Sequence, residues 1–400
     1  MRALLLNLLW PLAAALATLA VLGSATLLVL SLAAARRRPA RRASMEPVAP
    51  MLSLAIVVPA HNEACGIART LNNLLPLTQA DGASTVVVVA DNCSDDTAAV
   101  AHACGARVLQ RQDPDRRGKG CALDFAFHAL ATEGFDAYLV IDADSLVSAS
   151  LLPAVRAQLE AGAAAVQARY TVLQDHGAAP TLAQLALFAF NVLRPRGRAA
   201  LGLSAGILGN GFALRQAVLE RVPYSATSVV EDLEYHLHLI EAGERVVFAD
   251  DGEVWGEMPE RAEAQASQRT RWEGGRLRML REHGAPLLAR VLCGQWRLLE
   301  PLLDLLLPPL AYHALLLLAL LAMPWGWARA VALGGLAVLV LHVLCAARLG
   351  GIGWRGLARV ALRVPAYLWW KLRLVRDLWR ASSPRMAWVR TGRNIDSQQP

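Results

Sequence analysis

The chain has 400 residues, of which 55% are apolar, with a mean hydropathy of +0.35 and a formal net charge of +7. This composition exceeds one ordinary soluble domain and predicts that part of the chain lies in lipid. It also argues against nucleic acid as a partner, because eleven Arg or Lys gather in residues 348–400 against only Asp377 and Asp396, a distribution that favours a membrane surface.

The first predicted element is a membrane anchor. Residues 3–35 carry no charge, and the basic run RRRPARR follows directly at residues 36–42, which is typical of a membrane span with a cytoplasmic flank. A cleaved signal peptide is the alternative, but its apolar core would be shorter, about 7–15 residues. We therefore expect a transmembrane anchor at 1–35 and a basic cytoplasmic linker at 36–51.

The region after the linker predicts an α/β fold. Short apolar runs (LSLAIVV, TVVVVA, ARVLQ and AYLVIDAD) alternate with helical patterns at residues 64–75, 95–103 and 121–131. Apolar runs of this length, separated by helices, indicate strands buried on both faces of a mostly parallel, Rossmann-like sheet. Six cysteines without CxxC spacing or a metal-binding pattern fit a reducing cytoplasm.

Polar residues follow the predicted strands, at the edge where doubly wound sheets bind ligands. The first strand ends in PAHNE (59–63), the second in ADNCSDDT (90–97) and the fourth in DADS (142–145). Between them, RRGKGCAL places Lys119 between two glycines at the start of a helix, which favours phosphate binding. A simple surface turn is the alternative interpretation of Lys119.

The DADS segment predicts a metal site. In an extended chain, Asp142 and Asp144 would lie on the same side and repel each other unless a positive charge is near. Their hard oxygen ligands suit Mg²⁺ or Mn²⁺ bridging to a substrate diphosphate.

The segment TSVVEDLEYHLHL (227–239) allows two interpretations. Glu231 and Asp232 could form the solvated first turn of an amphipathic helix, since Leu233, His236, Leu237 and Ile240 follow at helical spacing. Alternatively, Asp232 is a catalytic base. His236 and His238 are expected to be ordinary helix residues.

The last predicted elements are two further spans and a basic tail. Residues 298–323 and 330–347 can each cross a bilayer core of about 30 Å, and Pro308 and Pro309 could kink the first of them. The positive-inside rule places the middle region and both arginine-rich flanks in the cytoplasm. Residues 285–297 and 348–400 are expected to lie at the interface, although a third span within 356–379 is an alternative.

Several motifs together resemble the family 2 inverting glycosyltransferases, which have a GT-A fold, and are similar to those of membrane-bound polysaccharide synthases of the poly-N-acetylglucosamine, hyaluronan and cellulose type. The motifs occur in the family's order over about residues 52–280, and we expect the GT-A domain at 52–284. They are VVPAHNE, VVVVADNCSDDT, RGKGCAL, VIDADS, GNGFALR, VVEDLEYHL and QRTRW.

For the donor side, the resemblance implies a nucleotide-sugar site, with a UDP-sugar expected. Glu63 and Asp91 match the acidic residues that hold the nucleobase and ribose, and Pro59 belongs to the same first motif. Lys119 matches a donor contact. The sequence has ADN where many relatives have two adjacent aspartates, so only Asp91 is carried over.

For the chemistry, the resemblance implies metal-dependent transfer of a hexosyl or N-acetylhexosaminyl group. Asp142 and Asp144 match the DxD pair, with Asp144 the more direct metal ligand. Asp232 falls on the base of the ED motif. Three residues match the QxxRW motif, whose arginine faces the diphosphate and whose tryptophan lies near the acceptor: Gln268, Arg271 and Trp272.

Alternatives remain for several of these motifs. QRTRWEGGRLR could be a basic helix near the membrane. GNG (209–211) is either a tight turn or an acceptor-side loop. Three arginines could meet lipid phosphate or simply flank a helix: Arg194, Arg196 and Arg198.

Together with the predicted spans, the resemblance implies a multi-pass enzyme of the inner membrane that glycosylates a hydroxyl of a lipid-linked or growing glycan acceptor, in exopolysaccharide or glycolipid biosynthesis. Export or polysaccharide-assembly proteins are possible partners. A processive polysaccharide synthase is the main alternative. A polyprenyl-phosphate glycosyltransferase and a non-catalytic membrane scaffold are less favoured, because QRTRW and the acidic residues are intact.

Overall fold

The computed structural model describes residues 2–36, 51–173, 181–226, 228, 230–257 and 262–381. The linker and the last 19 residues, on which some expectations fall, lie outside this part. The chain divides into two compact units. We call residues 1–37, 177–202 and 276–384 the helical unit, and residues 38–176, 203–275 and 385–400 the α/β unit. Each is described separately.

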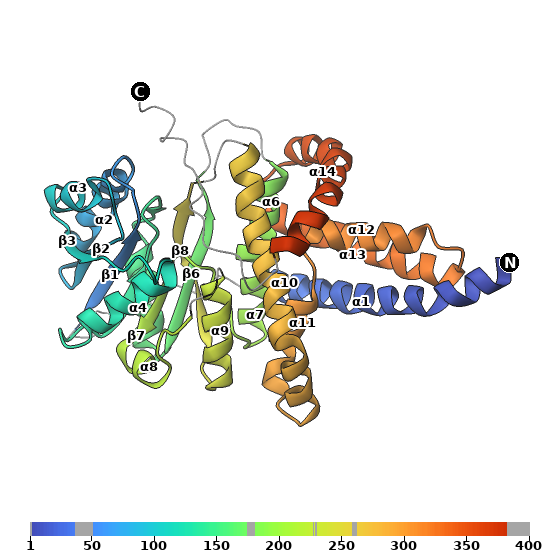
Figure 1. Cartoon of the computed structure of the whole chain (residues 1–400), viewed down its shortest axis with the longest axis horizontal. Coiled ribbons are helices and arrows are strands. Elements are labelled where there is room, and N and C mark those ends of the chain that lie inside the picture. The colour runs from blue at the N-terminus through green and yellow to red at the C-terminus, as the bar shows by residue number, and fades with distance from the viewer. Residues whose placement is uncertain are drawn as a thin grey trace. The chain divides into compact units, whose positions relative to one another are not determined.

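The α/β unit is built on one eight-stranded sheet with the order β3-β2-β1-β4-β7-β6-β8-β5 (Figure 1). Strands β1, β2, β3 and β4 pair in parallel, as do β6 and β8, whereas β7 runs antiparallel between β4 and β6. The predicted α/β fold is therefore confirmed, and the sheet that was expected to be mostly parallel also contains antiparallel pairs. The strands are β1 (Leu54–Ala60), β2 (Ser84–Asp91), β3 (Arg107–Arg111), β4 (Ala137–Val140), β5 (Leu146–Val147), β6 (Ala165–Val172), β7 (Phe212–Arg215) and β8 (Val246–Gly256).

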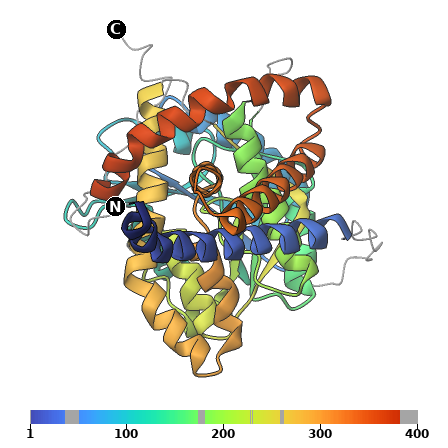
Figure 2. The same ribbon diagram turned by 90° about the vertical axis from the view of Figure 1, so that its right-hand side faces the viewer.

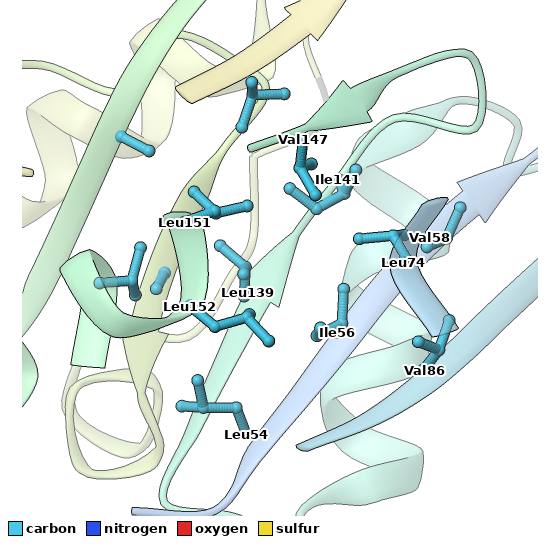
Figure 3. Close-up of a cluster of buried hydrophobic side chains, with 14 of the residues drawn as sticks. Leu54, Ile56, Val58, Leu74, Val86, Leu139, Ile141, Val147, Leu151 and Leu152 are labelled. Carbon is cyan, nitrogen blue, oxygen red and sulfur yellow. The ribbon is translucent and has the colours of Figure 1, made fainter. Parts of the chain in front are cut away.

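Helices cover both faces of this sheet, because alternate residues of its strands point to opposite sides. Leu54, Ile56 and Val58 of β1 join one apolar cluster with the helices α2 and α5, which Figure 3 shows. Ala55 and Val57 join the opposite cluster with α4, α8 and α9. The helices are α2 (Ile67–Asp81), α3 (Thr97–Ala103), α4 (Lys119–Leu130), α5 (Leu151–Glu160), α8 (Gln216–Arg221) and α9 (Glu231–Glu241).

The helical unit contains α1 (Arg2–Arg36), α12 (Leu310–Leu321) and α13 (Gly326–Leu349), which lie side by side, and α14 (Trp354–Ala381), which crosses them (Figures 1 and 2). Two helices, Leu9–Arg36 and Gly326–Leu349, are long and apolar enough to cross a membrane. The remaining elements are α6 (Leu182–Phe188), the π-helix η1 (Ala189–Leu193), α7 (Arg194–Ala200), η2 (Trp296–Leu298) and α11 (Leu299–Leu306). Helix α10 (Ala262–Leu292) belongs to both units.

The span predicted at 298–323 is a broken element. Residues Trp296–Leu306 and Leu310–Leu321 meet at an angle of 76°, and within the described residues this bent pair would supply a third candidate crossing only if it forms one span. Pro308 and Pro309 lie at the break, as the sequence predicts, because neither can donate a backbone hydrogen bond to continue the helix.

Buried polar pairs hold α1 within the helical unit. Ser24 shares a hydrogen bond with His313 of α12 at 3.0 Å, and Ser31 shares one with His342 of α13 at 2.8 Å. Ser31 also donates its only hydroxyl hydrogen to the Leu27 carbonyl at 2.6 Å, so His342 Nδ1 is the donor in the second pair. These bonds give α1 a defined orientation against its neighbours.

A buried ion cluster joins α7, α10 and α11 in the same unit. The Asp304 carboxylate pairs with Arg198 at 2.5 Å, with Arg276 at 2.9 Å and more loosely with Arg194 at 3.8 Å. Glu300 pairs with Arg198 as well. Arg194 and Arg198 thus contact acidic side chains inside the protein. This contact replaces the two roles considered from the sequence, which were binding lipid phosphate and flanking a helix.

Candidate active site

The site begins at Lys119, the first residue of α4. Gly118 precedes it with φ 115° and ψ 161°, a conformation that favours glycine. A Cβ on the next residue, Gly120, would lie 2.2 Å from the Ala226 carbonyl, so both glycines are needed for this turn. The Lys119 ammonium forms an ion pair with Asp142 and donates to the Gly209 carbonyl. Three separate segments therefore meet at one side chain.

Asp142 and Asp144 follow β4, but not in the extended conformation expected from the sequence. Strand β4 ends at Val140, and the Ser145 N–H donates to the Asp142 carbonyl at 3.1 Å, which closes a turn. Burial raises the pKa of Tyr170, and the charges of both Asp142 and Asp144 raise it further. The extended geometry assumed from the sequence is therefore replaced by a turn, and the pairing of the two carboxylates stays a prediction.

Glu231 and Asp232 start α9, as the helix interpretation predicts. Burial and the charge of Asp232 raise the pKa of Glu231 to about 7. Burial also raises the pKa of Asp232, although the Leu233 N–H, which donates to its carboxylate at 2.8 Å, and Lys119 oppose this. The same two residues are thus both a helix start and a pair of partly desolvated carboxylates, so the two interpretations of the sequence are compatible.

Burial and these acids shift the pKa values of the two cations of the site, Lys119 and Arg271. Burial alone would lower the pKa of Lys119, but Asp142, Glu231 and Asp232 outweigh it and raise the pKa. For Arg271 of α10 burial prevails, and its pKa is lowered despite Glu231 and Asp142. Its Nε is buried and, within the described residues, has no hydrogen-bond partner. Arg271 therefore lies within electrostatic range of the acidic cluster, and its Nε forms no hydrogen bond with the described residues.

The other two residues of the QxxRW motif lie on the same helix. Trp272 is 37% exposed, so it is not simply packed into the core. Gln268 is half-buried.

The fit of a divalent cation depends on the ligands that this chain supplies. Asp142 and Asp144 provide two hard carboxylates one residue apart. No group of three His, Cys, Asp or Glu side chains that could hold a metal is found in the part of the chain that the structure describes. Mg²⁺ binds through one or two carboxylates together with substrate phosphates. The residues therefore fit a cation that completes its coordination with a diphosphate and water.

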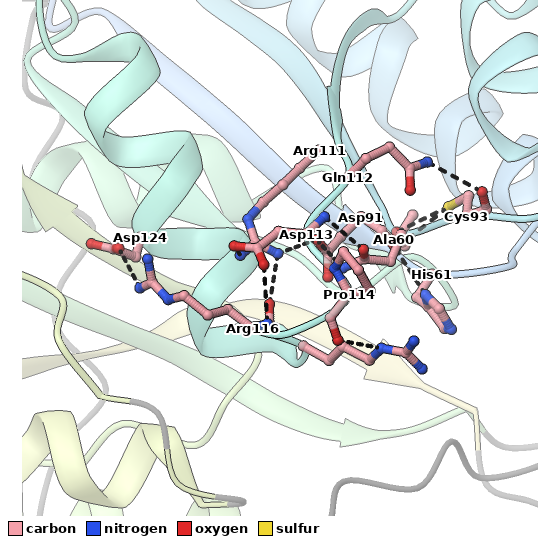
Figure 4. A network of polar contacts seen from close by, with 12 residues as sticks. Ala60, His61, Asp91, Cys93, Arg111, Gln112, Asp113, Pro114, Arg116 and Asp124 are labelled. Atoms are coloured by element: carbon pink, nitrogen blue, oxygen red, sulfur yellow. Dashed lines mark hydrogen bonds and ion pairs between the residues drawn. The ribbon is translucent and has the colours of Figure 1, made fainter.

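Asp91 belongs to a second polar network at the end of β2, which Figure 4 shows, and Glu63 lies three residues after the end of β1. Asp91 is buried and accepts from Arg111 at 2.6 Å, and Arg111 also donates to Asp113 at 2.8 Å. The Glu63 N–H donates to Thr97 at 2.7 Å, which fixes the backbone of PAHNE. Pro59 lies within β1, paired with a residue of β2.

The structure thus brings together five of the predicted site residues and Glu231, and places three others in or just after the neighbouring strands β1 and β2. The residues that gather around Lys119 are Asp142, Asp144, Asp232 and Arg271.

Two residues of the cluster were not predicted. Tyr170 of β6 shares a hydrogen bond with Asn210, and a Cβ on Gly256 would lie 2.8 Å from its hydroxyl. Asn210 is 1% exposed. The GNG motif signalled Asn210 without showing its role, whereas nothing in the sequence distinguishes Tyr170 from a strand residue.

This mixed sheet, with carboxylates, a lysine and an arginine beyond its strand ends, is similar to the GT-A fold of known glycosyltransferases. Residues 50–275 match the glycosyltransferase-like family 2, more than half of the chain, and the protein belongs to this family.

Two known proteins show the extent of the similarity. The probable glycosyltransferase YdaM of Bacillus subtilis is 26% identical over 235 residues, which cover 56% of this chain and 54% of that protein. The chain therefore matches about half the length of this curated relative. The solved structure of the mannosyltransferase PcManGT from Pyrobaculum calidifontis, in complex with GDP-Man and Mn²⁺, is 18% identical with a TM-score of 0.54, covering 91% of this chain and 99% of that one. It supports the fold.

Proposed function

We propose that the protein is an inverting, metal-dependent glycosyltransferase that moves a sugar from a nucleotide-sugar donor to a hydroxyl of a lipid-linked or glycan acceptor. The observation that carries this proposal is the convergence of Lys119, Asp142, Asp232 and Arg271, which come from four segments far apart in the chain. A structural surface would rarely gather desolvated carboxylates around a lysine and an incompletely paired arginine.

Each side chain has a chemical role in this proposal. The Asp232 carboxylate takes the proton of the acceptor hydroxyl as that oxygen attacks the anomeric carbon. Its raised pKa makes it a stronger base than an exposed aspartate. Attack from the face opposite the leaving diphosphate gives inversion in one displacement. Glu231 lies beside the base and orients it.

The leaving group is stabilised by the cations of the site. Negative charge builds up on the diphosphate as the sugar leaves, and Lys119 and Arg271 are placed to neutralise it. Mg²⁺ or Mn²⁺ held by Asp142 and Asp144 would neutralise charge on the same oxygens. Asp91 and Glu63 would contact the nucleoside, and Gln268 and Trp272 the acceptor side.

We also propose that the enzyme works at the cytoplasmic face of the inner membrane. The two apolar helices, the bent pair and the basic flanks support a multi-pass arrangement. Exposed Trp354, Leu362 and Trp369, interspersed with arginines on α14, support an interfacial position for that helix.

The donor is expected to be a UDP-sugar, and the GDP-Man complex of PcManGT makes GDP-sugars the necessary comparison. Purified membranes that contain the enzyme would be incubated with a panel of radiolabelled UDP- and GDP-sugars. Product length then separates single transfer from processive synthesis.

Asp232→Asn tests the chemistry directly. We expect this variant to retain nucleotide binding and to lose transfer by about 10²–10⁴-fold, the contribution of a positioned base. Asp124→Asn, a change of a half-buried surface aspartate that pairs with Arg116, is the matched control. Transfer at the wild-type rate by Asp232→Asn would assign the base to another group.

A further inference from the structure

The GNG loop, residues 209–211, contacts several residues of the site. Neither of the two roles considered from the sequence, a tight turn or an acceptor-side loop, would require so many contacts. The Asn210 side chain is buried, and both ends of its amide are used. Its Oδ1 accepts from the Asp142 N–H at 3.1 Å, and its Nδ2 donates to the Ser145 hydroxyl at 2.8 Å. Ser145 in turn donates to the Asp144 carboxylate at 3.4 Å. One neutral side chain therefore connects to both aspartates of the pair.

The backbone of Asn210 is fixed from behind by Gln167 of β6, which is fully buried. Gln167 Nε2 donates to the Asn210 carbonyl at 2.7 Å, and its Oε1 accepts from the Leu208 N–H at 2.9 Å. Because Gln167 holds the chain on both sides of Gly209, the loop has little freedom to shift along the sheet.

The two glycines lock the loop against neighbouring groups. Gly209 has φ +78°, its carbonyl accepts from Lys119, and a Cβ there would lie 3.2 Å from Asp232 Oδ2. Gly211 has φ +69°, and a Cβ there would lie 2.8 Å from Val254 Cγ2. Within three consecutive residues the loop therefore bonds to Asp142, Lys119 and Ser145, and it passes close to the proposed base, Asp232.

We propose that Asn210 is a positioning residue, which sets the Asp142–Asp144 pair at a fixed place relative to Asp232 and so determines the affinity for the nucleotide-bound cation. This inference rests on the proposed function, in which the pair holds that cation. Two carboxylates one residue apart repel each other, and an amide that accepts from one backbone and donates toward the other side chain restrains both without adding charge.

The magnitude follows from the usual effect of such supporting contacts. Loss of a hydrogen-bonded partner behind a metal ligand lowers metal affinity or activity by about 10–100-fold. We expect Asn210→Ala to weaken Mn²⁺ binding by that factor. Ser145→Ala removes only the connection to Asp144, and we expect a smaller loss in the same direction.

Asn73 offers a matched control in the same unit. It also joins two atoms of a neighbouring segment, because its Nδ2 donates to the Val147 carbonyl at 3.2 Å and its Oδ1 accepts from the Val147 N–H at 2.7 Å. These bonds lie on β5, after the aspartate turn. Asn73→Ala therefore removes two comparable hydrogen bonds without touching the pair.

The experiment measures Mn²⁺ binding to the purified full-length protein in detergent. Loss of the free Mn²⁺ electron paramagnetic resonance signal is followed with UDP present, and in a parallel series with GDP. The thermal midpoint of each variant is recorded. The inference holds if Asn210→Ala and Ser145→Ala weaken binding while Asn73→Ala does not.

Other outcomes overturn the inference. Wild-type Mn²⁺ affinity in folded Asn210→Ala, or an equal loss in Asn73→Ala, would reduce Asn210 to a general packing residue. If Asn210→Ala does not fold, unchanged Mn²⁺ affinity in Ser145→Ala would lead to the same conclusion. The variant Asp144→Asn distinguishes a failure of the proposed metal role from a failure of the positioning role of Asn210. If it binds Mn²⁺ as tightly as wild type, the metal role in the proposed function fails, and the inference fails with it.

Discussion

Glu231→Gln would change how the stability of the α/β unit depends on pH. The pKa of Glu231 is about 7 in the folded protein, against an ordinary value of 4.5, so the folded state binds this proton more tightly than the unfolded state does. Stability therefore falls as pH rises from 4.5 to 7, and the cost is complete above 7. At about 1.4 kcal/mol per pKa unit, that cost is on the order of 3 kcal/mol. Glutamine has no proton to lose, so Glu231→Gln removes this stability cost.

The assay is thermal unfolding of the full-length protein in detergent at pH 5 and pH 8. For a unit of this size, 1 kcal/mol corresponds to about 2–4 °C, so we expect Glu231→Gln to reduce the pH-dependent change in midpoint by about 5–10 °C. The variant should be the more stable protein at pH 8. Equal pH dependence in the two proteins would show that Glu231 is not desolvated beside Asp232.

Glu133→Gln serves as a control of opposite sign. The hydrogen bond from Arg107 lowers the pKa of Glu133, so its contribution to stability is present above the unfolded pKa and is lost as pH falls through the folded pKa. Removing this carboxylate should leave the change between pH 5 and pH 8 close to that of wild type.

Two further changes test the site and its surroundings. Chelation with EDTA should abolish transfer, and added Mg²⁺ or Mn²⁺ should restore it; transfer that is unaffected by EDTA would remove the metal role of Asp142 and Asp144. Gly120→Ala should destabilise the protein by more than the usual overpacking cost of about 1–3 kcal/mol, because its Cβ would lie 2.2 Å from the Ala226 carbonyl. Gly334→Ala, with nothing within 4 Å of the added methyl, is the control, and thermal midpoints in detergent measure both; equal midpoints would contradict the close contact.

The sheet could be predicted because strands that are buried on both faces are apolar at every position. LAIVV and VVVV are apolar at every position, and residues on both faces of β1 and β2 are buried. The antiparallel insertion of β7 between β4 and β6 could not be predicted, since FALR has the same character in either direction. Pairing direction depends on where the chain re-enters the sheet, which local composition does not report.

The acidic residues of the site could be predicted for a similar reason. Asp91 ends the apolar strand β2 and Asp142 lies two residues after the apolar strand β4, at the carboxyl edge of the sheet where ligands bind. Their partners could not. Asp91 pairs with Arg111, and Asp142 pairs with Lys119, so one aspartate faces a buried arginine and the other a lysine that the sequence assigned to the donor phosphate.

The ion pair between Lys119 and Asp142 affects how the proposed donor and cation would bind. Lys119 is held by Asp142 and by the Gly209 carbonyl, while three carboxylates act on its charge. A diphosphate that attracts Lys119 must therefore compete with Asp142, and a cation bound by Asp142 would weaken that competition by occupying the carboxylate. Donor and cation should then favour each other's binding by the same factor. The sequence contains both residues, but only the ion pair between them supports this proposed coupling of donor and cation binding.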